Sequence, residues 1–203
     1  MIEIFLFSAL LALFEMDTTY VGQFLISRAS VVGGVFGFLT GNLFFGLQIG
    51  IFTELLFADY NPIGGAVPPS GALSAGIAVL TMHFFGVDAY IAFFAGVLSG
   101  FIFSFIDKNI RRLKSEIQQK FHAKIINGTF APKQIIASGL FFQYCCALTF
   151  VFVIITLLGP FIVLALASAP QKLLSAFAFS YFMAPWIGLV SLFMSFSPKQ
   201  EAD

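Results

Sequence analysis

Charge and cysteine are both scarce in this sequence, and the two shortages limit what the protein can be. Only 10% of the 203 residues are charged, whereas 59% are hydrophobic and 29 are Phe. The mean hydropathy of +0.97 lies far above that of an ordinary soluble domain. Because lipid cannot form hydrogen bonds with unpaired backbone N–H and C=O groups, we expect an all-α, polytopic membrane protein. Residues 1–203 are interpreted as a single integral membrane domain.

Cysteine occurs only as the adjacent pair Cys145 and Cys146, within an apolar run. Free thiols in such a setting are usually packing residues, so neither a disulfide framework nor a metal site is expected. The GxSxG and HExxH motifs are missing, and the two histidines, His83 and His122, show no arrangement of nucleophile and base. We therefore expect no catalytic residue, no metal and no cofactor in this chain.

The ten basic and ten acidic residues cancel, so the net charge gives no reason to expect a nucleic-acid partner. Seven of the ten Lys and Arg residues fall in the connector 107–133, which the positive-inside rule places in the cytoplasm. Its apolar residues repeat with helical spacing, and Asp107 and Arg111 are spaced for an i,i+4 pair, as are Glu116 and Lys120. The connector is therefore predicted to be an interfacial helix on the cytoplasmic leaflet.

Uncharged runs predict about six hydrophobic elements along the chain. Ala89 to Ile106 is long enough to span a membrane, and so is Leu173 to Phe196, where Pro185 is expected to cause a kink. Gln134 to Gln171 is expected to hold one span, a turn near Gly159-Pro160 and a short apolar piece. The remaining runs are Ile4 to Phe14, Ala29 to Thr53 and Tyr60 to Val87.

The first of these runs, Ile4 to Phe14, is short for a span of about 20 residues. It can be a span if Glu15 and Asp17 sit at an interface or in a cavity, and otherwise it predicts a tilted or half-buried helix.

Glycine recurs at every fourth position in several places, which leaves a bare strip on a helix and allows another helix to approach closely. The glycines with this spacing are Gly33, Gly37 and Gly41, then Gly46 and Gly50, and later Gly96 and Gly100.

The segment 46–73 is the candidate substrate-site motif, because Glu54 and Asp59 interrupt a run that otherwise looks like membrane sequence. A carboxylate facing lipid is costly, so these side chains should face a cavity, a partner or water. A break rich in Pro and Gly follows and predicts a re-entrant hairpin buried in protein or lining a cavity. The residues of this break are Asn61, Pro62, Gly64, Gly65, Pro68 and Pro69.

Several stretches in this half of the chain resemble one known family. They are Phe24-Leu-Ile-Ser-Arg28, Gly46-Leu-Gln-Ile-Gly50, Thr53-Glu54-Leu55 and, above all, Pro62-Ile-Gly-Gly-Ala-Val-Pro-Pro69 with Ala72-Leu73. They are similar to the IIC subunit of the bacterial sugar phosphotransferase system, mannose/fructose/sorbose family. A weaker resemblance continues through His122-Ala123, Asn127-Gly128 and Leu140-Phe-Phe-Gln143.

This resemblance implies a sugar permease in the bacterial plasma membrane that carries a hexose or amino sugar inward. It also implies a IID membrane subunit as partner, together with cytoplasmic IIA and IIB subunits, of which IIB phosphorylates the sugar. An oligomeric complex is expected. The IIC chain would carry no phosphate and would not be catalytic by itself. Ser70 and Gln23 depart from the family, which commonly has acids at these positions.

A sugar site inside a membrane needs paired hydrogen-bond donors and acceptors. Glu54 is the first candidate ligand, with an ion pair to Arg28 as the alternative, and the two can hold in different states of transport. For Asp59, a binding role and an interfacial or capping role are equally supported. Gln143 is expected either to face the same cavity or to make an interhelical hydrogen bond. The supplementary candidates are Asn61, Ser70, Gln23 and Gln48, and Pro62, Gly64, Gly65, Pro68 and Pro69 are interpreted as backbone shapers.

The leading functional hypothesis is thus a sugar-transporting IIC subunit. The alternative is a non-transporting membrane scaffold or sensor derived from such a permease, which the changes at Ser70 and Gln23 favour. An intramembrane enzyme is disfavoured by the missing motifs.

Overall fold

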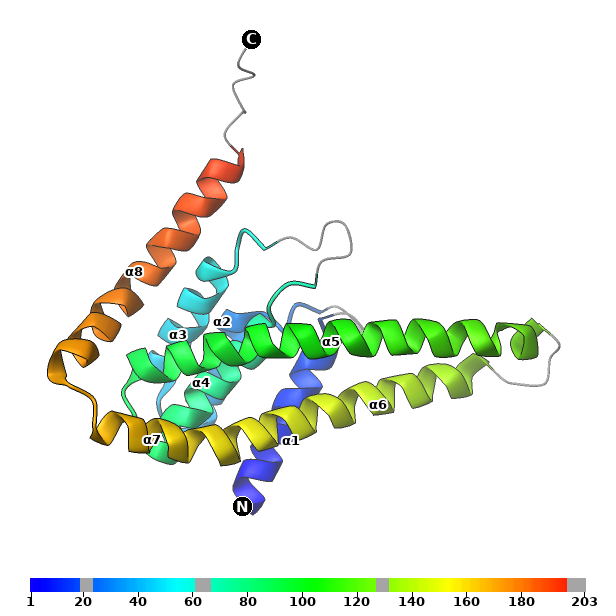
Figure 1. Cartoon of the computed structure of the whole chain (residues 1–203), viewed down its shortest axis with the longest axis horizontal. Coiled ribbons are helices and arrows are strands. Elements are labelled where there is room, and N and C mark those ends of the chain that lie inside the picture. Colours follow the sequence, from blue (N-terminus) through cyan, green and yellow to red (C-terminus); the bar gives the residue numbers. More distant parts are fainter. Residues whose placement is uncertain (19–23, 61–66, 127–131, 197–203) are drawn as a thin grey trace, which may run out of the picture.

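The computed structural model describes residues 1–18, 24–60, 67–126 and 132–196, and in these ranges the chain is helical and has no strand. The arrangement is shown in Figure 1. The predicted all-α, polytopic class is confirmed. The helices are α1 (Ile2–Met16), α2 (Ala29–Leu39), α3 (Leu43–Leu56), α4 (Gly71–Phe85), α5 (Ala89–Ile126), α6 (Pro132–Val153), α7 (Gly159–Ala167) and α8 (Gln171–Phe196).

Helix α4 forms the centre of the fold. Every residue from Ala72 to Thr81 is buried, because α1, α2, α3 and α5 all pack against this helix. The Ser70 hydroxyl caps its N-terminus by accepting from the Leu73 N–H. Gly86 ends it in the left-handed conformation, with φ of 62°. A helix that is apolar all round is thereby placed where it has protein on all sides.

Helices α2 and α3 form a tight hairpin whose contact is made by glycine. A Cβ added to Gly33 would collide with the carbonyl oxygen of Gly46, and one added to Gly46 would collide with that of Gly33. Gly37 and Gly50 belong to the same contact, which confirms the predicted close approach. Gly41 differs from the prediction, because it lies beyond the end of α2 with φ of 76° and serves the turn.

The prediction for the basic connector is wrong about where the preceding helix, α5, ends. We expected the span to end near Ile106 and a separate interfacial helix to follow. The connector is helical as predicted, but it continues α5 without interruption to Ile126. The sequence 101–126 contains no Gly or Pro, and the predicted Asp107–Arg111 pair forms in the first turn of the connector, with Nε to Oδ2 of 2.7 Å. A change from apolar to charged sequence therefore alters the surroundings of this helix without ending it.

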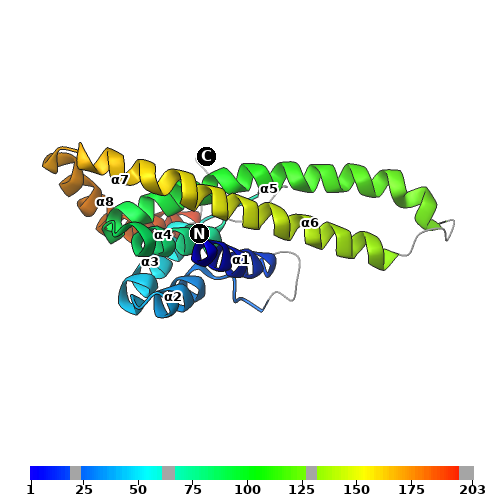
Figure 2. The same cartoon turned by 90° about the horizontal axis from the view of Figure 1, so that it is seen from below.

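The predicted turn near Gly159-Pro160 is also wrong. Helix α6 passes through a π-helical segment, Ile154–Leu158, directly into α7. Pro160 has no N–H to donate, and a wider turn before it lets the helix accommodate the ring without a break. The first part of α6 and the end of α5 extend together, away from the other helices (Figures 1 and 2).

Among the described residues, three helical segments are long and apolar enough to cross a membrane: Ala89–Glu116, Ile136–Ala165 and Gln171–Phe196. The helices α2, α3 and α4 are shorter and apolar. Together they agree with a membrane protein that has both full spans and shorter embedded elements.

Candidate functional site

A polar cavity of about 200 Å³ lies where the end of α1, the residues before α4 and the middle of α5 meet. Most of its walls come from segments that are apolar elsewhere, so its polar groups stand out. It is smaller than the range of about 300–1,000 Å³ usual for drug-sized ligands, which suits a single small polar molecule. The lining residues are Glu15, Thr18, Val67, Pro68, Pro69, Ser70, Gly71, Phe103, Ser104, Asp107 and Arg111.

Glu15 and Ser70 join two walls of this cavity although they are 55 residues apart. Glu15 is 7% exposed and Ser70 is 9% exposed. The Ser70 hydroxyl donates to Oε2 of Glu15 at 2.6 Å and accepts from the Leu73 N–H at 3.2 Å. The Ser70 N–H is 3.4 Å from the Gly100 carbonyl oxygen on α5. Ser70 therefore uses its hydroxyl and its backbone to fix the start of α4 between α1 and α5.

Asp107 lies on the α5 wall of the cavity and forms an ion pair with Arg111, which also lines it. Besides Nε of Arg111, its carboxylate accepts a hydrogen bond from Nε2 of Gln143, with Nε2 to Oδ1 of 2.8 Å. Oε1 of Gln143 in turn accepts from Nζ of Lys114 at 2.9 Å. For Gln143 the structure thus supports an interhelical hydrogen bond, which connects α6 to α5 directly behind the cavity.

Glu54 lies near the end of α3 and is bound by the segment that begins α2. Its Oε1 is 3.3 Å from Nη1 of Arg28, and its Oε2 accepts from both the N–H and the hydroxyl of Ser30. The Arg28 side chain is 58% exposed and that of Glu54 is 32% exposed. The ion pair that we considered for Glu54 is therefore present, and both of its side chains are partly exposed on the protein surface. Glu54 does not line the polar cavity.

Asp17 holds the segment that brings Arg28 to Glu54. Its carboxylate accepts from the Phe24 N–H at 2.8 Å and from the Ser27 N–H at 3.3 Å. Desolvation raises the pKa of this carboxyl, but the hydrogen bonds from Phe24 and Ser27 outweigh it and bring the pKa below its ordinary value. The chain immediately after Glu15 is thus tied to the segment that ends at Arg28.

The other candidates that the structure describes lie on α3 or between α3 and α4. Asp59 accepts from the Ser191 hydroxyl of α8, with Oδ2 to Oγ of 2.6 Å. Gln48 is half-buried on α3 and does not line the cavity. Pro68 and Pro69 line it directly. The candidates Gln23, Asn61, Pro62, Gly64 and Gly65 lie outside the described residues.

Sequence reasoning did not nominate Glu15, Asp107 or Arg111 as site residues. Two signals were visible: Glu15 ends an apolar run, and Asp107 and Arg111 are spaced as a pair. Spacing within either segment could not show that the middle of α5 lies close to the end of α1.

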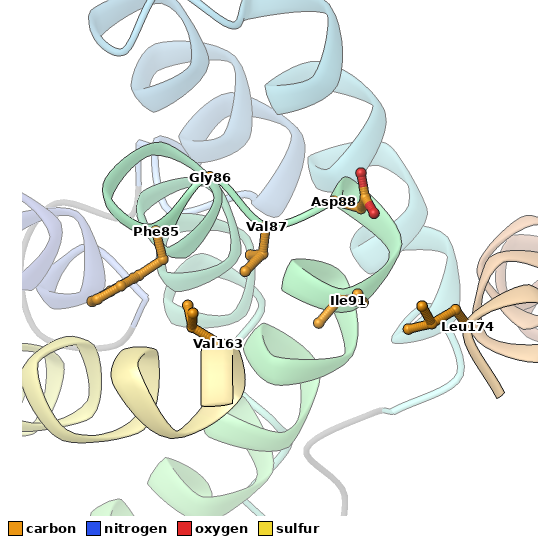
Figure 3. Close-up of a pocket in the computed structure, with 7 residues that line it drawn as sticks. All are labelled: Phe85, Gly86, Val87, Asp88, Ile91, Val163 and Leu174. Carbon is orange, nitrogen blue, oxygen red and sulfur yellow. The ribbon is translucent and has the colours of Figure 1, made fainter. Parts of the chain in front are cut away.

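A second cavity, of about 230 Å³, lies at the other end of α4 (Figure 3). Its lining is mostly apolar, and its one carboxylate, Asp88, accepts from the Tyr90 hydroxyl at 2.8 Å. Such a lining offers few partners to a hydroxyl-rich ligand. The polar cavity is therefore the better candidate site.

Comparison with known proteins agrees with the geometry. Residues 1–201 match the model of a family described as the PTS system sorbose-specific IIC component. No match was found among curated proteins. Because the family match covers nearly the whole chain, this protein belongs to the sorbose-type IIC components, the sugar permease subunits of the phosphotransferase system in the mannose/fructose/sorbose family.

Proposed function

We propose that this chain is the IIC subunit that carries a hexose or amino sugar inward across the bacterial plasma membrane, where a partner IIB subunit phosphorylates it. The observation that carries the proposal is the polar cavity near the motif: it is bounded by Pro68 and Pro69, which belong to the motif that resembles the sugar permeases, by the adjacent Ser70, and by Glu15 and Asp107. A buried site of this kind can pair sugar hydroxyls with carboxylates and a serine hydroxyl.

The expected partners are a IID membrane subunit and cytoplasmic IIA and IIB subunits. The large apolar surface of the chain supports association within the membrane. Many large side chains on α8 are exposed, among them Phe179, Trp186 and Phe193. The concentration of basic residues in 107–133 supports a cytoplasmic position for the end of α5.

Glu54 keeps a proposed role in sugar binding in a second state of transport. In the described state its carboxylate is satisfied by Arg28 and Ser30. If the first residues of α2 move away from α3, the same carboxylate becomes available to sugar hydroxyls. The other candidate ligands of such a state are Gln48, Asp59, Gln23 and Asn61. The segment 46–73 thus remains the proposed substrate motif.

The test is uptake by proteoliposomes that contain this chain with its partner subunits, IIA, IIB and the general phosphotransfer proteins. We expect sugar uptake that depends on phosphoenolpyruvate, and we expect Glu54→Gln to lower the rate at least tenfold while leaving membrane insertion unchanged. Glu116→Gln is the matched control, because Glu116 is exposed on α5, pairs with Arg112 and does not line the polar cavity. Sugar binding without uptake would instead support the scaffold or sensor alternative.

A further inference from the structure

The second cavity, at the far end of α4, combines an apolar interior with one carboxylate, that of Asp88 (Figure 3). Val87 is 8% exposed and forms part of its floor, whereas the adjacent Gly86 and Asp88 are exposed. Val163, from α7, is 41% exposed. The cavity is therefore apolar inside and carries its charge at the rim, which suits an amphiphilic ligand better than a sugar.

The depth of this cavity in the membrane follows from the length of α5. Asp88 and Asp107 flank residues 89–106, which are uncharged and helical. A helix of this length rises about 27 Å, close to the thickness of about 30 Å of a hydrocarbon core. The two carboxylates therefore lie near opposite faces of the membrane. With the basic connector on the cytoplasmic side, as proposed above, the cavity lies in the headgroup layer of the opposite leaflet.

The polar groups at this rim carry charges of both signs. Oδ2 of Asp88 accepts from the Tyr90 hydroxyl at 2.8 Å, and within the described residues Oδ1 has no hydrogen-bond partner. A carboxylate can accept several more hydrogen bonds than this one. The α8 wall of the cavity is formed by Leu174, and the exposed Lys172 lies two residues before it at the start of the same helix.

We propose that this cavity binds the headgroup of phosphatidylethanolamine from the leaflet opposite the cytoplasm. The lipid ammonium donates to Asp88, and its phosphate lies toward Lys172. The acyl chains run along α7, where Phe161 is 69% exposed and Leu164 is 71% exposed. A choline headgroup has the same charge but no N–H donor, and an anionic headgroup would be repelled by Asp88. This lipid site is separate from the polar cavity and goes beyond the proposed sugar transport.

The experiment measures equilibrium binding of short-chain phosphatidylethanolamine, phosphatidylcholine and phosphatidylglycerol. The sample is the full chain, purified with its partner membrane subunit and freed of lipid in detergent. The wild type should bind phosphatidylethanolamine about tenfold more tightly than phosphatidylcholine, and phosphatidylglycerol most weakly. Asp88→Asn should give phosphatidylethanolamine and phosphatidylcholine equal affinities, because Asn can still accept from Tyr90 and precede a helix but has no charge.

Two further variants localise the effect. Asp88→Glu keeps the charge and should keep the preference, which provides a readout if Asp88→Asn does not fold. Glu3→Gln is the matched control and should behave as wild type, because Glu3 is exposed in the first turn of α1 and does not line the cavity. It belongs to the same end of the molecule, since Phe7 of α1 packs against Phe84 near the end of α4.

A soluble ligand tests whether the acyl chains matter. Free phosphoethanolamine should bind at least about tenfold more weakly than the lipid, because it buries no acyl chain. Equal wild-type affinities for phosphatidylethanolamine and phosphatidylcholine would overturn the proposal, as would a preference that survives in Asp88→Asn or is lost in Glu3→Gln. Equal binding of free phosphoethanolamine and the lipid would overturn the lipid as occupant. None of these measurements contains sugar, so the transport function is tested separately by uptake.

Discussion

At the scale of single residues, Ser70 shows how one hydroxyl can serve both the fold and the site. It caps α4 through the Leu73 N–H and at the same time donates to Glu15. The hydroxyl hydrogen goes to the carboxylate, and a lone pair accepts from the backbone, so the two bonds do not compete. A carboxylate at this position could cap the helix but would place a second negative charge against Glu15.

We therefore expect Ser70→Ala to destabilise the protein by about 1–3 kcal/mol, because it removes a helix cap and leaves Glu15 without its donor. Thermal unfolding in detergent measures the change. Ser175→Ala is the matched control, because Ser175 is exposed on α8 and its hydroxyl donates only to the Lys172 carbonyl oxygen of its own helix. Equal melting temperatures for the two variants would show that the Ser70 contacts contribute nothing.

At the scale of helices, the contact between α2 and α3 depends on the absence of side chains at four positions. The backbone of Gly46 lies directly against Gly33 and Gly37, so even a methyl group must push the helices apart. Because Glu54 is held by Arg28 and Ser30 at one end of this same hairpin, its spacing also sets the geometry of that ion pair.

Gly46→Ala should accordingly cost about 1–3 kcal/mol, the range usual for overpacking a tight contact. Gly139→Ala is the control, because a Cβ at Gly139 on α6 meets nothing within 4 Å. In that position alanine should be neutral or slightly stabilising, since it is the better helix former. Denaturation midpoints of the two variants measure the difference, and a loss of equal size in both would contradict the importance of the glycine contact.

The same scale explains what the sequence could and could not predict. The glycine repeats that include Gly33 and Gly46 predict a close helix contact, because each four-residue repeat lies within a single helix. Ser70, Pro68 and Pro69 could be selected from one motif for the same reason. The bond between Glu15 and Ser70 depends instead on how α1 and α4 pack, which no spacing within either segment records. The end of α5 was misplaced for a related reason, since polarity marks where lipid ends and not where a helix ends.

At the scale of the whole molecule, α8 packs against the other helices mainly through α3 and α5. Gly188 lies against the Leu55 carbonyl oxygen, and Tyr181 packs between Phe52 and Phe93. The opposite side of α8 is exposed and apolar, as suits a helix that faces lipid or a partner subunit. Helix α8 is thus joined through α3 to the segment 46–73, the proposed substrate motif, and Asp59 provides the polar part of this connection.

The bond between Asp59 and Ser191 should therefore couple α8 energetically to the segment that follows α3. In a double-mutant cycle with Asp59→Ala and Ser191→Ala, we expect a coupling of about 0.6 kcal/mol and at most about 1.7 kcal/mol, the values found for hydrogen bonds between membrane helices. Thermal unfolding of the wild type, the two single variants and the double variant gives this quantity. Ser195→Ala replaces Ser191→Ala in the control cycle, because the Ser195 hydroxyl donates to the Leu192 carbonyl oxygen within α8. That control should show no coupling to Asp59, since the two side chains share no partner. Additive effects in the Ser191 cycle would mean that packing at Gly188 and Tyr181 alone holds α8 against α3.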